Sequence, residues 1–263
     1  MKLTETFVKY LAGLFDADGT LTFNFSGGAC RLHLAFAQVR DRGDHLMPIL
    51  LRDIGGAVCD IEQRSDKHRP VQLWTLTRRA SIEMLVPRLV KHMVIKGKHW
   101  ARLLDLWRDH RSVVLPDAIV SGLKNEARVS RMNTGPLKPK KHPTWAWVAG
   151  YLDGDGCYIN HYNKTTTQRS MAVQVQCSEG DRQGADLLHQ AFGGTIRTGS
   201  DKRYGSTFVK WRRGLGPRDA DFAFDFLAKM VSHTHMKRQH IETFIYTLRQ
   251  RLNRKTPAGE ATV

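Results

Sequence analysis

Apolar residues recur every three or four positions in two segments of the chain, a pattern typical of amphipathic helices. The first segment begins after Thr4, a favourable N-cap, and ends at Gly19. The second begins after Pro143 and Thr144 and ends at Gly156. We expect each helix to end with its glycine in the left-handed conformation.

Alternating apolar and polar residues predict strands after each of these helices. We expect the same order in each half of the chain: helix, two strands, helix, two strands and further helices. Alternating segments occur at 21–25, 31–38, 58–64 and 71–77, and again at 158–164, 170–176, 195–200 and 206–213. This order predicts an α+β fold of two tandem αββαββα units, each a four-stranded antiparallel sheet backed by helices.

The two predicted helices share a sequence motif. Residues 11–19 are LAGLFDADG and residues 148–156 are VAGYLDGDG, 137 positions apart. A later landmark also repeats, because Gln38 and Gln176 each precede a Gly-Gly pair by 17 residues. We therefore interpret the chain as two copies of one unit.

Each motif combines small residues with an acidic end. An Ala-Gly pair occupies 12–13 and 149–150, and small residues allow two helix backbones to approach closely. If the helices pack there, Asp18 and Asp155 emerge side by side. A carboxylate at the negative end of a helix dipole is disfavoured by about 0.3–1 kcal/mol, so a bound cation is the simplest reason for the acidic residues.

Two other interpretations of Asp-x-Asp-Gly were considered. Calcium loops of the EF-hand type close with Glu at the twelfth position. The corresponding positions here are Gly27 or Phe25 and Lys164 or Tyr162, which argues against that type of site. A surface turn with solvated carboxylates is the second alternative, and the matched flanks of the two copies argue against it.

The charge balance indicates a polyanionic partner. Lys and Arg total 41 against 25 Asp and Glu, which gives a net charge of +16 and a pI of about 10.0, so binding should weaken with salt. No apolar run approaches the roughly 18 residues that suggest a transmembrane helix, and we expect no signal peptide. The four cysteines form no C-x-x-C pair, which favours a reduced, intracellular protein.

The motif pair and its matched flanks resemble the LAGLIDADG homing endonuclease family in its single-chain form with two motifs. The resemblance covers nearly the whole chain and implies a monomer with internal pseudo-symmetry, whose two sheets form a saddle over double-stranded DNA. We expect a first half at 1–125, a basic, proline-containing linker at 126–143, and a second half at 144–263 with a disordered tail from about 254.

The resemblance also implies roles for particular residues. Asp18 and Asp155 would bind divalent metal ions, and Asp16 and Asp153 would be structural. The remaining catalytic and metal-binding candidates are matched in pairs: the backbone carbonyls of Ala17 and Gly154 at the metals, Lys96 and Lys237 polarising solvent or stabilising phosphate charge, and Gln38 and Gln176 in a solvent network.

The sheet face away from the helices is the predicted DNA-binding surface, because side chains there can contact base edges in a major groove. An error of one residue in strand phase would exchange the two faces. The candidate DNA-binding residues are Thr22, Asn24, Arg31, His33, Arg64, His161, Asn163, Arg169, Lys210 and Arg212.

The resemblance predicts a site-specific endonuclease that hydrolyses both strands of a long DNA target and leaves 3′ overhangs. We expect Mg²⁺ as cofactor, with Mn²⁺ as a substitute and Ca²⁺ supporting binding without cleavage. Two alternatives stay open: an RNA maturase acting on intron RNA, and a DNA-binding protein that does not cut. We expect no membrane partner and access to DNA inside the cell. The 25 Arg, 16 Lys and 6 Asn favour a bacterial or phage gene over an organellar one.

Overall fold

The computed structural model describes residues 3–26, 29–40, 45–61, 69–110, 114–132, 134–136, 142–162, 169–201 and 206–253. Arg64, Asn163 and the tail expected from about 254 lie outside these ranges.

The first unit contains α1 Glu5–Ala17, β1 Gly19–Ser26, β2 Ala29–Val39, α3 Leu46–Asp53, β3 Ala57–Ile61, β4 Val71–Leu76, α4 Arg79–His92, α5 Gly97–His110 and α6 Asp117–Ser130. The second contains α7 Trp145–Gly154, β5 Gly156–Tyr162, β6 Arg169–Ser178, α8 Arg182–Phe192, β7 Thr195–Asp201, β8 Ser206–Gly214, α9 Ala220–His233 and α10 Arg238–Asn253, with short 3₁₀ turns before α8 and α9.

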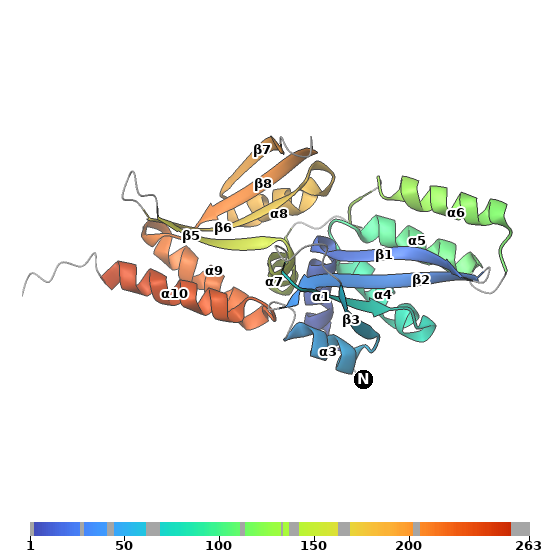
Figure 1. Cartoon of the computed structure of the whole chain (residues 1–263). Coiled ribbons are helices and arrows are strands. Elements are labelled where there is room, and N and C mark those ends of the chain that lie inside the picture. Colours follow the sequence, from blue (N-terminus) through green and yellow to red (C-terminus); the bar gives the residue numbers. More distant parts are fainter. Residues whose placement is uncertain are drawn as a thin grey trace, which may run out of the picture.

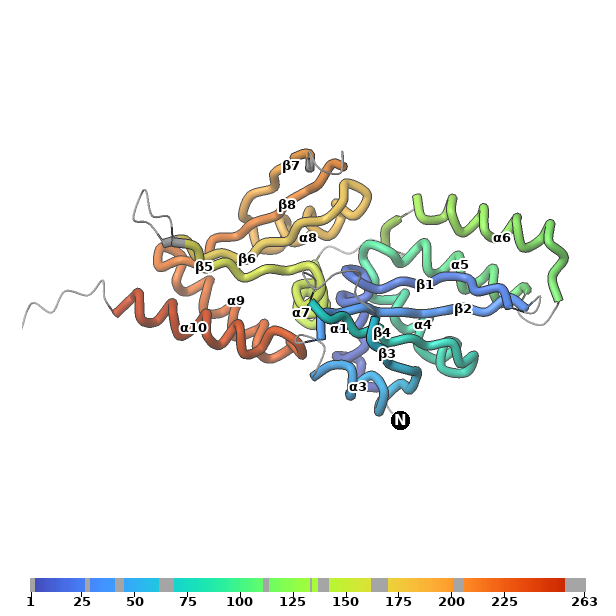
Figure 2. The backbone as a smooth tube through the Cα atoms, in the orientation of Figure 1, coloured from blue at the N-terminus to red at the C-terminus, as the bar shows by residue number. Residues whose placement is uncertain are grey.

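Each unit is built on a four-stranded antiparallel sheet. The strand orders are β1-β2-β4-β3 and β5-β6-β8-β7, so the two sheets have the same topology. Figure 1 shows the sheets on either side of the motif helices α1 and α7, and the tube in Figure 2 shows the same arrangement. This confirms the predicted α+β fold of two tandem units. Helix α6 continues through residue 125 to Ser130, across the boundary expected there.

Both motif helices begin as predicted. Thr4 is the N-cap of α1, and its Oγ1 accepts a hydrogen bond from the backbone N–H of Phe7 at 3.2 Å. Thr144 caps α7 in the same way, accepting from the N–H of Trp147 at 3.3 Å. Each threonine satisfies one of the amide groups that a helix start leaves without an intrahelical partner.

The prediction for the helix ends was wrong. Asp18 and Asp155 are the C-caps, in right-handed conformations, and neither Gly19 nor Gly156 has a positive φ. Space is the reason for glycine here. A Cβ atom at Gly19 would lie 2.1 Å from Cδ1 of Phe15, and one at Gly156 would lie 2.4 Å from a backbone oxygen one turn earlier.

The motif helices touch through their backbones. A Cβ atom added to Gly13 would lie 2.0 Å from the carbonyl oxygen of Trp147, and one added to Gly150 would lie 1.9 Å from that of Tyr10. Real Cβ atoms essentially never approach so closely, so no other residue fits at either position without moving a helix. This confirms the predicted contact between the two motifs.

A buried tryptophan marks the same place in each half. Trp74 donates from Nε1 to the carbonyl oxygen of Gly55 at 2.9 Å, and Trp211 donates to that of Gly193 at 2.8 Å. Both side chains are fully buried. Both glycines, and the glycine that follows each, have positive φ, a conformation that glycine adopts readily. The Gly-Gly landmarks of the sequence are therefore equivalent in space.

Helix α6 is attached to α5 by a buried polar contact. Nδ1 of His99 lies 2.7 Å from Oγ of Ser130, and burial lowers the pKa of His99 to about 4, with the cations Arg131 and Lys96 adding to the effect.

Among the residues that the structure describes, none of the helices is both long and apolar enough to cross a bilayer.

Replacing Gly13 with Ala should lower the free energy of unfolding by at least about 2 kcal/mol, because the new methyl group overlaps the facing backbone. Chemical denaturation measures the change. Gly122→Ala is the control: this glycine lies inside α6 with nothing within 4 Å of the added Cβ, so the variant should gain about 0.5–1 kcal/mol. Equal stability of the Gly13 and Gly122 variants would contradict the close contact.

His99 should make the fold sensitive to mild acid. Because its folded pKa is about 4 and its ordinary value 6.5, the unfolded chain binds the proton first as the pH falls. The stabilisation is complete above pH 6.5 and is lost between pH 6.5 and 4, by about 3 kcal/mol. Unfolding curves at several pH values should show a flatter profile for His99→Gln, whereas His161→Gln at an exposed position should match the wild type.

Candidate active site and nucleic-acid interface

Asp18 and Asp155 lie next to each other at the C-terminal ends of the motif helices. A Cβ atom at Gly154 would lie 3.1 Å from Oδ2 of Asp18 and 2.5 Å from Cβ of Ala17, so the second motif needs glycine beside the first carboxylate. Burial, and after it the negative charge of Asp18, raise the pKa of Asp155 to about 7. The contact between α1 and α7 thus holds together two carboxylates that repel each other.

This pair suits a hard divalent cation. Mg²⁺ is commonly held by one or two carboxylates, with water and substrate phosphates as its other ligands. No group of three or more His, Cys, Asp or Glu side chains able to hold a metal occurs among the described residues. The donors therefore fit a cation shared with a phosphate-containing ligand better than one enclosed by protein.

Two lysines bind the ends of the motif helices, Lys96 half-buried and Lys237 buried. Nζ of Lys96 donates to the carbonyl oxygens of Phe15, Ala17 and Gly19 at 3.1, 3.0 and 2.9 Å. Burial lowers the pKa of Lys96, while the charge of Asp16 opposes this shift. The ammonium group satisfies carbonyls that a helix end leaves without partners, and its charge suits the negative end of the helix dipole.

Lys237 does the same in the second half. Its Nζ donates to the carbonyl oxygens of Leu152, Gly154 and Gly156 at 2.5, 3.4 and 2.5 Å. The lysines predicted to act on solvent or phosphate therefore bind backbone carbonyls, including those of Ala17 and Gly154 that were predicted at the metals. Their role in catalysis stays a prediction, but the structure adds a positioning role that the sequence did not indicate.

Asp16 and Asp153 are buried anchors rather than solvent-facing acids. Each accepts hydrogen bonds from the segment that follows α4 or α9 and one from an aromatic residue of the other motif helix. The donors to Asp16 are the N–H groups of Val94, Ile95 and Lys96 at 2.6, 3.2 and 2.8 Å and Nε1 of Trp147 at 2.9 Å. The donors to Asp153 are the N–H groups of His235 and Met236 at 3.0 Å, the Thr234 hydroxyl at 2.6 Å and the Tyr10 hydroxyl at 2.8 Å.

Gln38 lies beside the candidate metal site. Its side chain is 7% exposed on the helix-covered face of β2, and Nε2 donates to Oδ2 of Asp18 at 3.4 Å. This contact can orient the carboxylate. The structure therefore brings Gln38 to the first acid of the pair.

The predicted equivalence of Gln176 with Gln38 was wrong. Gly19 pairs with Phe36, and Gly156 pairs with Val175, so Phe36 and Val175 are equivalent. The residues two positions after them, Gln38 and Cys177, are therefore equivalent as well. Cys177 is buried, whereas Gln176 is exposed on the opposite face of β6. The count to Gly-Gly misled because one more residue separates the strand from the glycines in the first half; a shift of one residue changes the face.

No protein-family profile matches the sequence, and no curated protein sequence matches it. Solved structures are nevertheless similar over the whole chain. A crystal structure of the LAGLIDADG homing endonuclease I-GzeII with its DNA target has a TM-score of 0.68 at 12% identity, covering 96% of this chain and 92% of that one. I-SmaMI bound to uncleaved DNA with calcium ions gives 0.66 at 13% identity, covering 97% and 95%, and I-SmaMI bound to cleaved DNA gives 0.64 at 14%, covering 98% and 93%.

The chain has the LAGLIDADG homing endonuclease fold. In this fold the predicted outer face is correct for the first sheet. Thr22 pairs with His33 and Asn24 pairs with Arg31, so all four side chains share the face opposite the buried Leu21.

The second sheet of this LAGLIDADG fold also presents predicted residues on its outer face. Lys210 and Arg212 alternate with buried Val209 and Trp211, and exposed His161 lies on the outer side of β5. The side chain of Arg169 lies outside the part of the chain that the structure describes.

Two residues of this outer face were missed. Arg197 pairs with Lys210, and Gln174 pairs with Arg212. The alternation of Arg197 with half-buried Ile196 was the signal that could have found the arginine.

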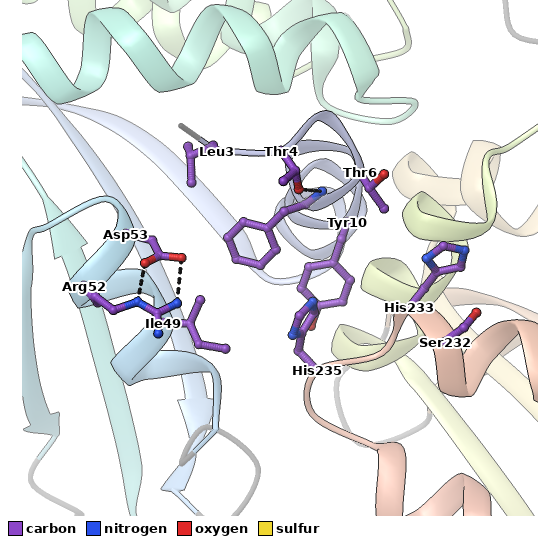
Figure 3. Close-up of a pocket in the computed structure, with 11 residues that line it drawn as sticks. Leu3, Thr4, Thr6, Tyr10, Ile49, Arg52, Asp53, Ser232, His233 and His235 are labelled. Carbon is purple, nitrogen blue, oxygen red and sulfur yellow. Dashed lines mark hydrogen bonds and ion pairs between the residues drawn. The ribbon is translucent and has the colours of Figure 1, made fainter. Parts of the chain in front are cut away.

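A hollow at the far end of α1 is separate from the acidic pair. Figure 3 shows this cavity, of about 310 Å³, between α1, α3 and the end of α9, with the Arg52–Asp53 ion pair on one wall and His235 against Tyr10 on another. Thr4 lines it, at the N-terminal end of the helix whose other end carries Asp18. A different cavity, of about 430 Å³, is lined by Asp155 and Lys237.

Removing the Lys96 ammonium should destabilise the protein even without any ligand. Lys96→Met leaves three carbonyl oxygens without their donor, and we expect a loss of about 1–3 kcal/mol in the free energy of unfolding. Lys98→Met, at an exposed position two residues later in the first turn of α5, should change stability by less than about 0.5 kcal/mol. If both variants are as stable as the wild type, the ammonium does not hold the helix end.

Proposed function

We propose that this protein is a site-specific DNA endonuclease that hydrolyses a phosphodiester bond in each strand of a long duplex, with divalent metal ions as cofactors. The observation that carries the proposal is the adjacency of Asp18 and Asp155 at the junction of two sheets. The outer faces of those sheets present basic side chains, among them Arg31 and Arg212. Neighbours in fold are described as bound to DNA targets, one with calcium ions and one with cleaved DNA.

Asp18 and Asp155 are the residues that would hold Mg²⁺. A bound Mg²⁺ supplies Lewis acidity, which activates water for attack and stabilises the negative charge of the leaving oxygen. The chain contributes position: Gln38 donates to the Asp18 carboxylate, and Lys96 and Lys237 hold the two helix ends on which the acids stand. The mutual repulsion of the carboxylates favours a cation between them.

The positive charge supplies affinity. With a net charge of +16, the protein can neutralise several phosphates, and the release of their counterions makes binding fall steeply with salt. The basic side chains that would contact phosphates are spread over both sheets, whereas the two acids occupy a single point. Binding and cleavage should therefore be separable by mutation.

One chain provides both halves of the site. Each motif helix contributes one acid, and their contact is intramolecular. Single-motif relatives would need a symmetric dimer to make this arrangement. We infer that the protein acts as a monomer.

Asp18→Asn and Asp155→Asn should each reduce double-strand cleavage by at least roughly a hundredfold, the effect of losing one strong electrostatic stabiliser. The target is first recovered by incubating the wild type with a randomised duplex library and Mg²⁺ and sequencing the cut ends. Cleavage of that duplex by the variants is then followed on gels. Affinity for the duplex should stay within a few-fold of the wild type.

Asp105→Asn, at an exposed position of α5, is the matched control and should cut normally. Full cleavage by either Asn variant of the motif acids would overturn the assignment of the site. If instead a folded intron RNA outcompetes the duplex at equal salt and no cut appears with Mg²⁺ or Mn²⁺, the maturase alternative replaces the endonuclease.

A further inference from the structure

The strand registers show which positions of the two sheets are equivalent. In each half, the strand that directly follows the motif helix begins with a glycine that pairs with the next strand. Gly19 of β1 pairs with Phe36 of β2, and Gly156 of β5 pairs with Val175 of β6. The pairings with the next two strands continue from there without a break. Residues of the two outer faces can therefore be compared in rows. A row here is a set of three directly paired residues, one each on β2, β4 and β3 or on β6, β8 and β7.

The row closest to the acidic pair has opposite chemistry in the two halves. In the first sheet, Ala37 pairs with Leu73, and Leu73 pairs with Cys59. In the second sheet, the equivalent row is Gln176, Lys210 and Arg197. Three side chains that cannot donate or accept a strong hydrogen bond thus occupy the places of an amide and two cations.

The row on one side extends the contrast at two of its three positions, and the row on the other side is aliphatic in the first sheet but mixed in the second. On one side, Ala35, Thr75 and Ala57 occupy the places of Gln174, Arg212 and Thr195. On the other side, Val39, Val71 and Ile61 occupy those of Ser178, Phe208 and Gly199. Ile61 is 43% exposed, so a large apolar side chain is in contact with water at this position.

The amide and basic side chains described on this face of the first sheet lie elsewhere. Asn24 and Arg31 pair near the turn between β1 and β2, far along the strands from Gly19. The apolar surface is therefore confined to the part of the first sheet that is nearest the motif helices. We call Ala37, Leu73, Cys59, Val39, Val71 and Ile61 the apolar inner patch, and Gln174, Gln176, Arg197, Lys210 and Arg212 the polar inner patch.

The apolar and hydrogen-bonding groups on the edges of the bases determine which bases each patch can select. In the major groove, the thymine 5-methyl group is the apolar feature, and small or aliphatic side chains contact it. Arg and Lys pair with O6 and N7 of guanine, and Gln pairs with N6 and N7 of adenine. The ammonium of Lys210 lies 5.6 Å from the centre of the Phe208 ring, a cation–π contact that restrains the side chain on the outer face.

We propose that the apolar inner patch selects thymine through its methyl groups, whereas the polar inner patch selects purines through hydrogen bonds. The inner base pairs of the two half-sites therefore differ in chemistry as well as in sequence. This inference rests on the proposed binding of duplex DNA. It adds the kind of base that each half of the protein requires.

Base analogues test the proposal without changing the protein. Deoxyuridine in place of thymidine removes only the methyl group, and 7-deazaguanine removes only the N7 acceptor. Each analogue is placed in the inner positions of one half-site of the recovered target, and affinity is measured by fluorescence anisotropy with Ca²⁺. Deoxyuridine should weaken binding about three- to fourfold per methyl group lost from an apolar contact, in one half-site only. 7-Deazaguanine should weaken binding in the other half-site only.

A pair of equivalent variants assigns the half-sites to the sheets. Leu73→Ala should abolish the discrimination between thymidine and deoxyuridine and keep the sensitivity to 7-deazaguanine. Lys210→Ala should do the reverse. Circular dichroism and unfolding curves of both variants show that a lost preference does not come from a lost fold.

The outcomes separate this inference from the proposed function. If the recovered duplex is bound and cut normally but deoxyuridine is neutral in both half-sites, the apolar patch does not select thymine, and the endonuclease proposal stands. If no duplex is bound or cut, both proposals are overturned. If light scattering shows a dimer without DNA that Leu73→Asp dissociates, the patch is covered by a second copy of the chain and the inference is wrong.

Discussion

The architecture depends on one contact between two helix backbones. Gly13 and Gly150 bring α1 and α7 so close that a single added methyl group would overlap a carbonyl oxygen of the facing helix. Because protein interiors are close-packed, such an overlap cannot be absorbed locally. Buried hydrogen bonds from Trp147 to Asp16 and from Tyr10 to Asp153 cross the same contact in both directions. The relative position of the two sheets follows from this contact.

The contact also concentrates negative charge at one point. Asp18 and Asp155 cap adjacent helix ends, where the dipoles already disfavour a carboxylate. Two lysines on the carbonyls of the same ends offset part of this cost and hold the backbone in place. Burial and the charge of Asp18 nevertheless raise the pKa of Asp155 to about 7. A divalent cation and a phosphate would complete the site.

The two halves keep one framework and differ around the candidate site and on their outer faces. Equivalent tryptophans bond to equivalent glycines, and equivalent aspartates anchor the segments after α4 and α9. The differences appear beside the acidic pair and on the outer faces of the sheets. Gln38 beside Asp18 is replaced by Cys177 in the second half, and the outer row of Ala37, Leu73 and Cys59 is replaced by an amide and two cations. A duplicated unit can thus preserve its fold and change its ligand.

Features that depend on neighbours in the chain were predictable from the sequence alone. Periodicity determined the α+β order, Thr4 determined the start of α1, and the repeated motif determined the paired acids, because capping and amphipathicity act within a few residues. Features that depend on pairing across space were decided by the tertiary structure. The sequence could not show that Gln176 faces away from Gln38, that Lys96 binds carbonyls, or that Gly19 is needed for room beside Phe15. For Gln176 and Lys96 the distance between segments remote in sequence decides what the side chain contacts, and for Gly19 the exact path of the chain at the helix end decides it; only the folded chain sets both.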